Sequence, residues 1–215
     1  MKKLMTFTSP GKTHTRLSGL ILIGLLCAGT VAQADEVIFS NSGGTPWQLY
    51  LGSSSNWMVP VQGAETTSHK SKVVTVRKID NAATADAVQA EWKGGLGQVY
   101  WQQSDPQDYR ALAEQDGALS MVIRIDRKPK KSVDLKMDCG YPCAGSLNMT
   151  KLFKAVPEDT WFRISLKLSC FEKAGANLEN ILAPLVIATK GAFKLSISDV
   201  RLLAEPPAES LIDCD

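Results

Sequence analysis

Four acidic residues in strand-like segments are the side chains best suited to chemistry in this chain: Glu91, Asp126, Asp134 and Asp138. Two carboxyl groups on opposite sides of a sugar are sufficient for glycoside hydrolysis. Asp134 and Asp138 are four residues apart on one predicted strand, so they share a face with Lys136 between them. A charged, solvated face of a sheet explains this arrangement without catalysis. We therefore predict no catalytic residue and a protein that is not an enzyme, with a cryptic glycosidase as the least favoured alternative.

Other catalytic or cofactor-binding patterns are missing from the sequence. The two histidines are His14, near the start of the chain, and His69, alone in a polar loop. The sequence has no HExxH motif, no Cys/His cluster at zinc spacing and no G-x-S-x-G nucleophile elbow. The glycines of Gly94–Gly97 do not open a predicted helix and lack a following lysine, so they do not predict a phosphate site. We predict no metal site and no cofactor.

The cysteines predict disulfide bonds rather than reactive thiols. Cys139 and Cys143 flank a Gly-Tyr-Pro turn at the end of a predicted strand, with three residues between them where a redox pair has two. A structural bridge between them is favoured, and Cys170 is then left to pair with Cys214. Pairing of Cys139 or Cys143 with Cys170 stays open, because strand ends can meet across a sheet.

Aromatic residues that break the apolar phase of their strands are candidates for binding. Trp92 and Trp101 continue the apolar phase and are expected in the core, whereas Tyr100 falls on the opposite phase and is expected to face solvent. An exposed aromatic ring stacks on the apolar face of a sugar, while nearby polar side chains hydrogen-bond its hydroxyls. For each aromatic, packing is the competing interpretation. The candidate carbohydrate-binding residues are Tyr100, Trp57 and Tyr141 for stacking, with Gln98, Gln102 and Arg124 as polar partners.

Strict alternation of apolar and polar residues predicts the strands that must position these side chains. Each such strand has one apolar face, and the strands are stable when two sheets pack with their apolar faces together. The pattern predicts an all-β jelly-roll sandwich of nine or ten short strands with one or two short helices, over residues 108–115 and 149–155. The alternating segments are Leu119–Ile125, Val133–Cys139, Phe162–Cys170 and Phe193–Ile197.

Three further segments carry specific expectations. A hairpin is expected from Ala87–Trp92 and Gln98–Gln102, because the glycines between them allow the turn. Leu182–Thr189 is more continuously apolar and is expected to be a strand covered on both faces. Gly63–Lys72 is expected to be a surface loop.

The first 34 residues predict a secretory signal peptide. Lys2, Lys3, Lys12 and Arg16 precede an apolar run of about 15 residues, shorter than the roughly 20 of a membrane span, and Ala32-Gln-Ala34 is a cleavage site. A retained anchor is the alternative. The mature chain is then a single domain, residues 35–215, with no membrane span and a periplasmic or secreted location.

The charge balance argues against a nucleic-acid partner. The whole chain has 24 basic and 22 acidic residues, and the predicted leader holds four basic and no acidic ones. The mature chain therefore carries 20 basic and 22 acidic residues, a net charge near −2, without the basic surplus that nucleic-acid binding requires.

Several short runs are similar to one known family. They are residues 86–94, 97–100, 117–119, 137–143 (MDCGYPC), 161–164 and 170–176 (CF-x-x-AGA). On these runs the chain resembles, over about residues 47–203, the C-terminal galactose-binding-like domain of glycoside hydrolase family 3 exo-β-glucanases, the ExoP-type domain. The resemblance implies a jelly roll of the carbohydrate-binding-module type without catalytic residues. Folds of this type often hold a structural calcium ion, although no acidic cluster here singles out a site.

The resulting hypothesis is an exported, non-catalytic protein that binds a β-glucan or a related polysaccharide or oligosaccharide. A separate glycoside hydrolase is the second candidate partner. The alternative is an envelope structural or protein-docking module with no sugar ligand, which a contiguous exposed apolar patch would favour.

Overall fold

The computed structural model describes residues 35–40, 45–68, 72–81 and 85–214. The predicted leader, residues 1–34, and His69 lie outside this part of the chain.

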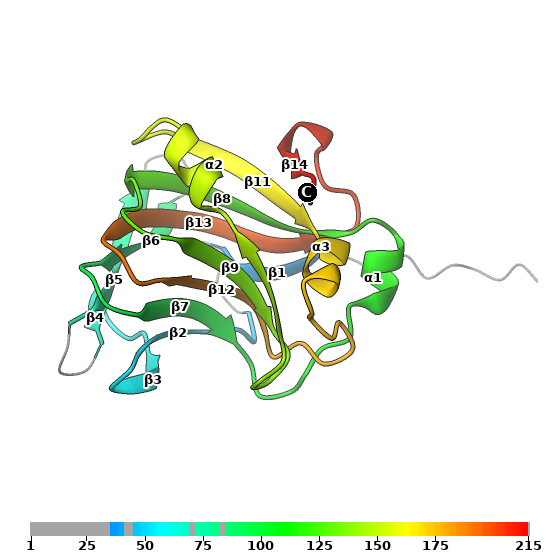
Figure 1. Ribbon diagram of the computed structural model, residues 1–215, viewed down its shortest axis with the longest axis horizontal. Helices are drawn as coiled ribbons and strands as arrows, with labels where there is room; N and C mark the ends of the chain where they lie inside the picture. The colour runs from blue at the N-terminus through cyan, green and yellow to red at the C-terminus, as the bar shows by residue number, and fades with distance from the viewer. Residues whose placement is uncertain (1–34, 41–44, 69–71, 82–84, 215) are drawn as a thin grey trace, which may run out of the picture. The chain divides into compact units, whose positions relative to one another are not determined.

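Within these residues, fourteen strands, more than the nine or ten expected, form two sheets that lie as separate layers (Figure 1). All neighbouring strands are antiparallel except β14, which pairs in parallel with β11. The eight-stranded sheet has the order β14 (Leu211–Ile212), β11 (Trp161–Lys167), β8 (Ala118–Arg127), β13 (Phe193–Leu203), β6 (Ala85–Trp92), β5 (Val74–Asn81) and β4 (Glu65–Thr67), with β1 (Glu36–Phe39) paired to β13. The six-stranded sheet has the order β10 (Ala144–Asn148), β9 (Val133–Asp138), β12 (Ala183–Thr189), β7 (Gly97–Gln102), β2 (Gln48–Ser53) and β3 (Asn56–Pro60). The additional strands are short pieces such as β4 and β14.

The core lies between the inner faces of the two sheets, as the alternation predicts. Along β9, Val133, Leu135 and Met137 are fully buried, while Asp134 and Lys136 alternate with them on the outer face. Burying each such apolar side chain contributes about 1.5–3 kcal/mol. The expected β-sandwich is confirmed, and Trp92 and Trp101 lie in its core.

Strand β12 is buried along its whole length, which confirms the expectation from its continuous apolar sequence. Leu185 and Ile187 belong to the core between the sheets. Val186 lies on the other side, in a small cluster with Tyr100 and Ala183.

The expected hairpin over residues 87–102 is wrong. β6 pairs with β5 and β13, whereas β7 pairs with β2 and β12, so the two strands belong to different sheets. The intervening glycine-rich segment crosses between the layers where they approach closely. A Cβ atom on Gly97 would lie 3.0 Å from Cγ1 of Val73 and 3.2 Å from Cδ1 of Trp92. The glycines therefore permit a crossing between sheets here rather than a tight turn within one sheet.

The segment Phe162–Cys170 is only partly a strand. β11 ends at Lys167, and α3 (Leu168–Lys173) follows. Residues 168 and 170 are apolar and continue the two-residue period of the strand. However, Leu168 and Phe171, which are three positions apart, are both fully buried, and this is the spacing of side chains on one face of a helix. The loop expected at residues 63–72 also contains the short edge strand β4.

The remaining helices are short. α1 (Arg110–Glu114) and α2 (Thr150–Ala155) lie within the ranges predicted for helix, and a 3-10 turn, η1, spans Ala208–Ser210. Within the described residues, every helix is too short or too polar to cross a bilayer.

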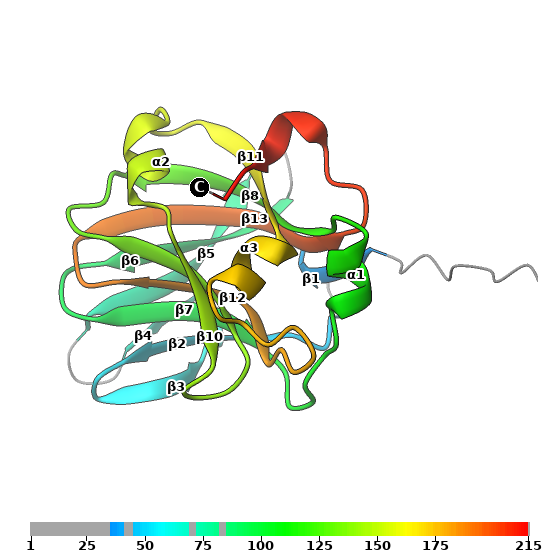
Figure 2. The ribbon, with the colours of Figure 1, turned by 45° about the vertical axis from the view of Figure 1, so that its right-hand side comes forward.

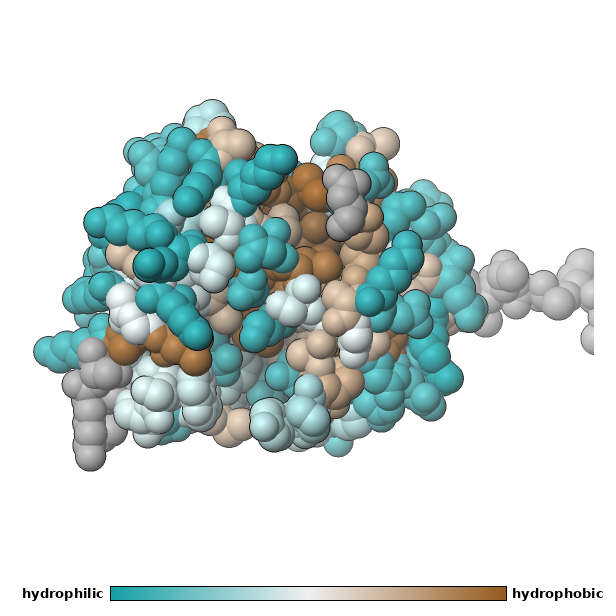
Figure 3. Space-filling model, viewed as in Figure 1, coloured by the Kyte–Doolittle hydropathy of each residue, from teal (hydrophilic) through white to brown (hydrophobic). Residues whose placement is uncertain are grey.

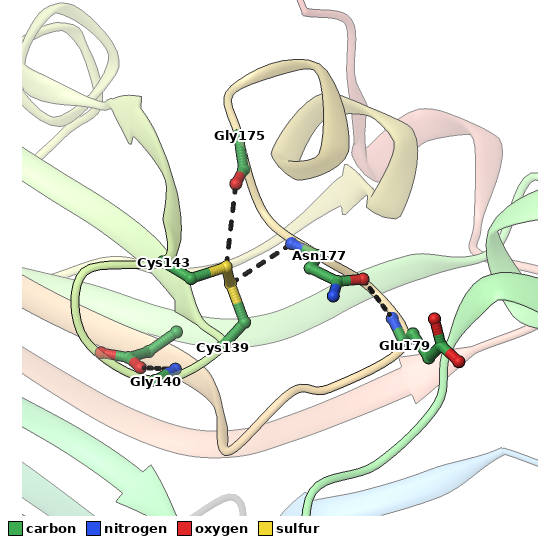
Figure 4. Close-up of a disulfide and its surroundings, with 7 residues drawn as sticks. Cys139, Gly140, Cys143, Gly175, Asn177 and Glu179 are labelled. Atoms are coloured by element: carbon green, nitrogen blue, oxygen red, sulfur yellow. Dashed lines mark hydrogen bonds between the residues drawn. A yellow bond between two sulfur atoms is a disulfide. The ribbon is translucent and has the colours of Figure 1, made fainter.

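Both disulfides have the favoured pairing. Cys139 is bonded to Cys143, with a sequence separation of 4, and Cys170 of α3 is bonded to Cys214, with a sequence separation of 44. The first bond pins the turn between β9 and β10, where the Asn177 N–H approaches Cys139 Sγ at 3.2 Å (Figure 4). The second ties the C-terminal segment to the rest of the fold.

The two disulfides should differ in their contribution to stability, because the longer loop loses more entropy from the unfolded chain. We expect C170A/C214A to lower the free energy of unfolding by about 4 kcal/mol and C139A/C143A by about 2 kcal/mol. Urea unfolding of both double variants against the oxidised wild-type chain measures this. A larger loss for the short loop would contradict the loop-entropy explanation.

Candidate functional site

The outer face of the six-stranded sheet brings polar and aromatic side chains into one row. Strand register places Lys136 of β9 beside Val186 of β12, Val186 beside Tyr100 of β7, and Tyr100 beside Tyr50 of β2. Because side chains alternate along each strand, these four share the face that points away from the core. The row runs across four strands at the middle of the sheet.

Tyr100 and Tyr50 form a stacked pair on this face. Their ring centroids are 5.4 Å apart with an interplanar angle of 19°. The Tyr100 hydroxyl donates a hydrogen bond of 2.9 Å to the backbone carbonyl of Trp57. Tyr100 was expected to face solvent, and this is wrong: it lies on the outer face as its phase predicts but is only 5% exposed, because Tyr50 and Val186 cover it.

Burial raises the pKa of Tyr100 to about 12, with smaller contributions from neighbouring Tyr50 and from the negative charge of Asp138. The phenol is therefore protonated and acts as a hydrogen-bond donor at neutral pH. Its role on this face is to support Tyr50 and to anchor β3 through the Trp57 carbonyl.

Two glutamines of β7 flank Tyr100 on the same face. Gln98 lies between Ala188 and Gly52 of the neighbouring strands, and Gln102 lies beside Gln48. Gln98 and Gln102 are half-buried, so their amide groups can reach a ligand lying across the sheet. Amides both donate and accept hydrogen bonds, which suits the hydroxyl groups of a sugar.

The edge strand β3, which pairs with the strand that carries Tyr50, adds exposed apolar side chains. Trp57 is 43% exposed and Met58 is 53% exposed. The bond from Tyr100 to the Trp57 carbonyl fixes the backbone of β3 next to Tyr50. An exposed indole beside a row of amides has the composition of a sugar-binding surface.

Tyr141 is fully exposed at the tip of the turn between β9 and β10. The turn is held by the Cys139–Cys143 bond and by the Gly140 N–H, which donates to Asp138 Oδ1 at 2.7 Å (Figure 4). Asp138 follows Lys136 on the outer face of the six-stranded sheet, so the turn leaves the end of that face.

Arg124 does not join the other predicted site residues. It lies on β8, on the outer face of the eight-stranded sheet, where its guanidinium is 5.2 Å from the ring centroid of Trp161. Arg124 Nε donates to Asp126 Oδ1 at 2.6 Å. The core separates this arginine from Tyr100, so one ligand cannot contact both.

The four acidic residues considered for catalysis are divided between the two outer faces. On the eight-stranded sheet, Asp126 accepts hydrogen bonds from Arg124, Gln89 and Ser196, and Glu91 lies 3.3 Å from Arg127. On the six-stranded sheet, the paired groups are Asn148 with Asp134 and the Gly140 N–H with Asp138. These contacts account for each carboxylate as a structural acceptor. Among the described residues, no group of three or more metal-binding side chains gathers.

The sequence reasoning missed Tyr50 and Met58. Tyr50 follows Trp47-Gln-Leu49, where the alternation of Leu49 and Leu51 already places it on the outer phase. That signal was available, since Tyr50 has the same phase relation to its strand as Tyr100. Met58 lies in a turn-rich segment without alternation, and its exposure depends on the edge position of β3.

Two antiparallel sheets with a polar and aromatic outer face define a β-sandwich of the carbohydrate-binding-module type. Within that class, the chain belongs to the Exop_C family of galactose-binding domain-like proteins, whose sequence profile matches residues 45–202. The match confirms the resemblance expected from the sequence over residues 47–203.

Solved structures show the same fold. The extra C-terminal domain of the exo-1,3/1,4-β-glucanase ExoP from a Pseudoalteromonas species superimposes with a TM-score of 0.70 and 18% identity, covering 84% of this chain and 99% of that domain. Against the ExoP enzyme as a whole, the match covers 22% of that chain. No curated protein matches the chain significantly.

Two carbohydrate-binding modules of Clostridium thermocellum are also similar. The family 30 module of a cellulosomal cellulase has a TM-score of 0.58 and 15% identity, covering 81% of this chain and all of the module. The family 11 module, in complex with a β-1,3-1,4-mixed-linked tetrasaccharide, has a TM-score of 0.50 and 11% identity, covering 80% of this chain and 96% of the module. At these identities the similarity shows the fold.

Asp126 should be a structural residue whose charge stabilises the eight-stranded sheet. Asp126→Asn keeps the shape of the side chain but replaces one carboxylate oxygen by an NH₂ group. That group would face the hydrogen-bond donors of Gln89, Arg124 and Ser196, and Arg124 would lose its counter-charge. We expect the free energy of unfolding to fall by about 2 kcal/mol. Urea unfolding measures this, with exposed Asp105→Asn as a control that changes stability by less than about 0.5 kcal/mol. Equal values for the two variants would contradict the assignment.

Tyr100 should make stability fall at alkaline pH. Above the ordinary tyrosine pKa near 10, the unfolded chain loses this proton while the folded chain keeps it to about 12, so the free energy of unfolding declines between these values. Tyr100→Phe should lower stability by about 1 kcal/mol at pH 7, through loss of the bond to Trp57, and make the decline shallower. Unfolding curves at pH 7, 9, 10 and 11 measure both effects. Parallel pH curves for the two proteins would exclude Tyr100 as the source.

Proposed function

We propose that this protein is a non-catalytic carbohydrate-binding protein that holds a β-glucan, or a related polysaccharide, on the outer face of the six-stranded sheet. The observation that carries the proposal is the combination, in the six-stranded sheet, of the Tyr50–Tyr100 pair, the amides of Gln98 and Gln102 on the same face, and exposed Trp57 on the neighbouring edge strand. Aromatic rings supply stacking surface, and the amides supply paired donors and acceptors for sugar hydroxyls.

The ligand class is supported by what similar proteins bind or act on. The ExoP domain comes from an exo-1,3/1,4-β-glucanase, and the family 11 module was solved with a β-1,3-1,4-mixed-linked tetrasaccharide. A mixed-linkage β-glucan is therefore the first ligand to test, and a separate glycoside hydrolase that acts on the same glucan is the partner that this role implies. Location outside the cytoplasm is supported by the two disulfides.

The predicted residues have different roles in this proposal. Trp57 and Tyr50 stack on sugar rings, and Gln98 and Gln102 hydrogen-bond the hydroxyls. Tyr100 supports Tyr50 from below, since it is covered. Tyr141 lies at the end of the same face and extends the surface for a longer chain. Arg124 is not part of the surface, because it lies on the opposite sheet.

Affinity gel electrophoresis tests the proposal, with mixed-linkage β-glucan, laminarin and soluble cellulose derivatives in the gel. We expect retardation by at least one β-glucan. Trp57→Ala and the double variant Q98A/Q102A should weaken binding at least tenfold, because each removes contacts worth more than about 1.4 kcal/mol. Lys194→Ala, on the outer face of the other sheet, is the matched control and should bind as wild type. Absence of retardation across a broad glycan panel would refute the proposal.

A further inference from the structure

A separate apolar groove lies at the margin of the sandwich, between α2, α3 and the C-terminal segment. Figure 3 shows brown, hydrophobic residues in a hollow at this place. The groove has a volume of about 920 Å³. Its apolar lining includes Leu147, Met149, Leu152, Ala155, Leu166 and Ile212. It uses none of the residues assigned above to sugar binding.

One wall of the groove is the edge strand β10, which pairs only with β9 within the described chain. Two backbone hydrogen bonds define the pattern of this antiparallel pair: Met149 N–H donates to the Val133 carbonyl, and Cys139 N–H donates to the Cys143 carbonyl. The backbone N–H and C=O groups of the odd-numbered residues along β10 therefore point towards β9. The backbone N–H and C=O groups of Ser146 therefore point the other way, because successive residues alternate in direction. Ser146 and Asn148 line the groove.

The turn after α3 covers the beginning of this edge, because a Cβ atom on Gly175 would lie 3.5 Å from the Ala144 carbonyl oxygen. Helix α3 itself packs against the face of β10, where a Cβ atom on Gly145 would collide with the Phe171 carbonyl (Figure 2). Beyond Gly145 the strand runs along the groove to α2. An edge strand with free backbone groups is a template for one more strand.

The rim of the groove carries more positive than negative charge. Lys151 of α2 and Lys173 of α3 line it, and neither forms an ion pair with a carboxylate of the described chain. The acidic residue of the rim, Asp213, interacts with Lys167, which itself pairs with Asp116 at 2.9 Å. The lining thus holds two lysines against one carboxylate, a net charge of +1 that favours an acidic ligand.

We propose that this groove binds an extended, acidic segment of a partner protein by strand addition to β10. Alternate apolar side chains of the segment enter the groove, its backbone pairs with Ser146, and its acidic side chains meet Lys151 and Lys173. An acyl chain fits the apolar lining less well, because it would bury the free N–H and C=O groups of β10 without partners. This inference is independent of sugar binding.

The probe is a pool of fluorescein-labelled heptapeptides that alternate Val or Leu with Glu, titrated with the protein in fluorescence anisotropy. We expect saturable binding, and at least tenfold weaker binding when Lys replaces Glu. N-methylation of the alternate amides that face β10 should also weaken binding at least tenfold, because it removes strand pairing. No binding at millimolar peptide, or equal binding of the Glu and Lys pools, overturns the proposal.

Ser146→Pro is the matching protein variant. Proline removes the Ser146 N–H, which points away from β9, and leaves the bonds to β9 intact, whereas Ser146→Ala keeps that N–H and is the control. We expect S146P to bind at least tenfold more weakly than S146A, with thermal unfolding confirming that both fold. A second variant, K151E/K173E, should prefer the Lys peptides.

Three outcomes identify another occupant and overturn the proposal. Equal affinity of S146P and S146A means that the edge of β10 is not used. Displacement of the peptide by palmitate, with insensitivity to N-methylation, means that an acyl ligand is the occupant. Dimerisation in analytical ultracentrifugation that Leu152→Asp abolishes means that a second copy of the chain covers the groove.

Discussion

Contact between the apolar inner faces of the two sheets is the constraint on which the rest of the molecule depends. Strands β9 and β12 supply Leu135 and Ile187 from one sheet, and β8 and β13 supply Ile123 and Leu195 from the other. Because side chains alternate with a period of two, a slip of one residue would exchange the two faces of a strand. The core therefore decides not only stability but also which side chains each outer face can present to a ligand.

That division gives the two outer faces different characters. The charged groups on the outer face of the eight-stranded sheet pair with each other. Asp126 forms an ion pair with Arg124, and Asp199 forms ion pairs with Arg163 and Arg201. The face of the six-stranded sheet keeps amides and aromatic surface beside the Tyr50–Tyr100 pair. Charged groups that already pair with each other are poor ligands for other molecules, whereas half-buried amides and exposed rings are suited to a neutral polysaccharide.

The local sequence predicted the individual strands better than it predicted which strands pair with each other. Alternation identified β8, β9, β11 and β13, and cysteine spacing favoured the observed disulfides. Alternation fixes a strand's two faces but not its partners, which is why β6 and β7 were expected in one hairpin and lie in different sheets. It also cannot distinguish a strand from a helix when Leu168 and Phe171 suit both, and it cannot tell that Tyr50 would cover Tyr100. Those outcomes depend on contacts between residues far apart in the chain.

The bond between Cys170 and Cys214 has a consequence for where the molecule can work. The bond fastens residues 212–214 to α3, and these residues form one wall of the apolar groove beside β10. In a compartment that reduces thiols, this wall would be held by the two-residue ladder of β14 with β11, by the hydrogen bond between Ser210 and Ser165, and by packing of Ile212 on the core. The shape of the groove therefore depends on this disulfide, which reduction by glutathione would remove.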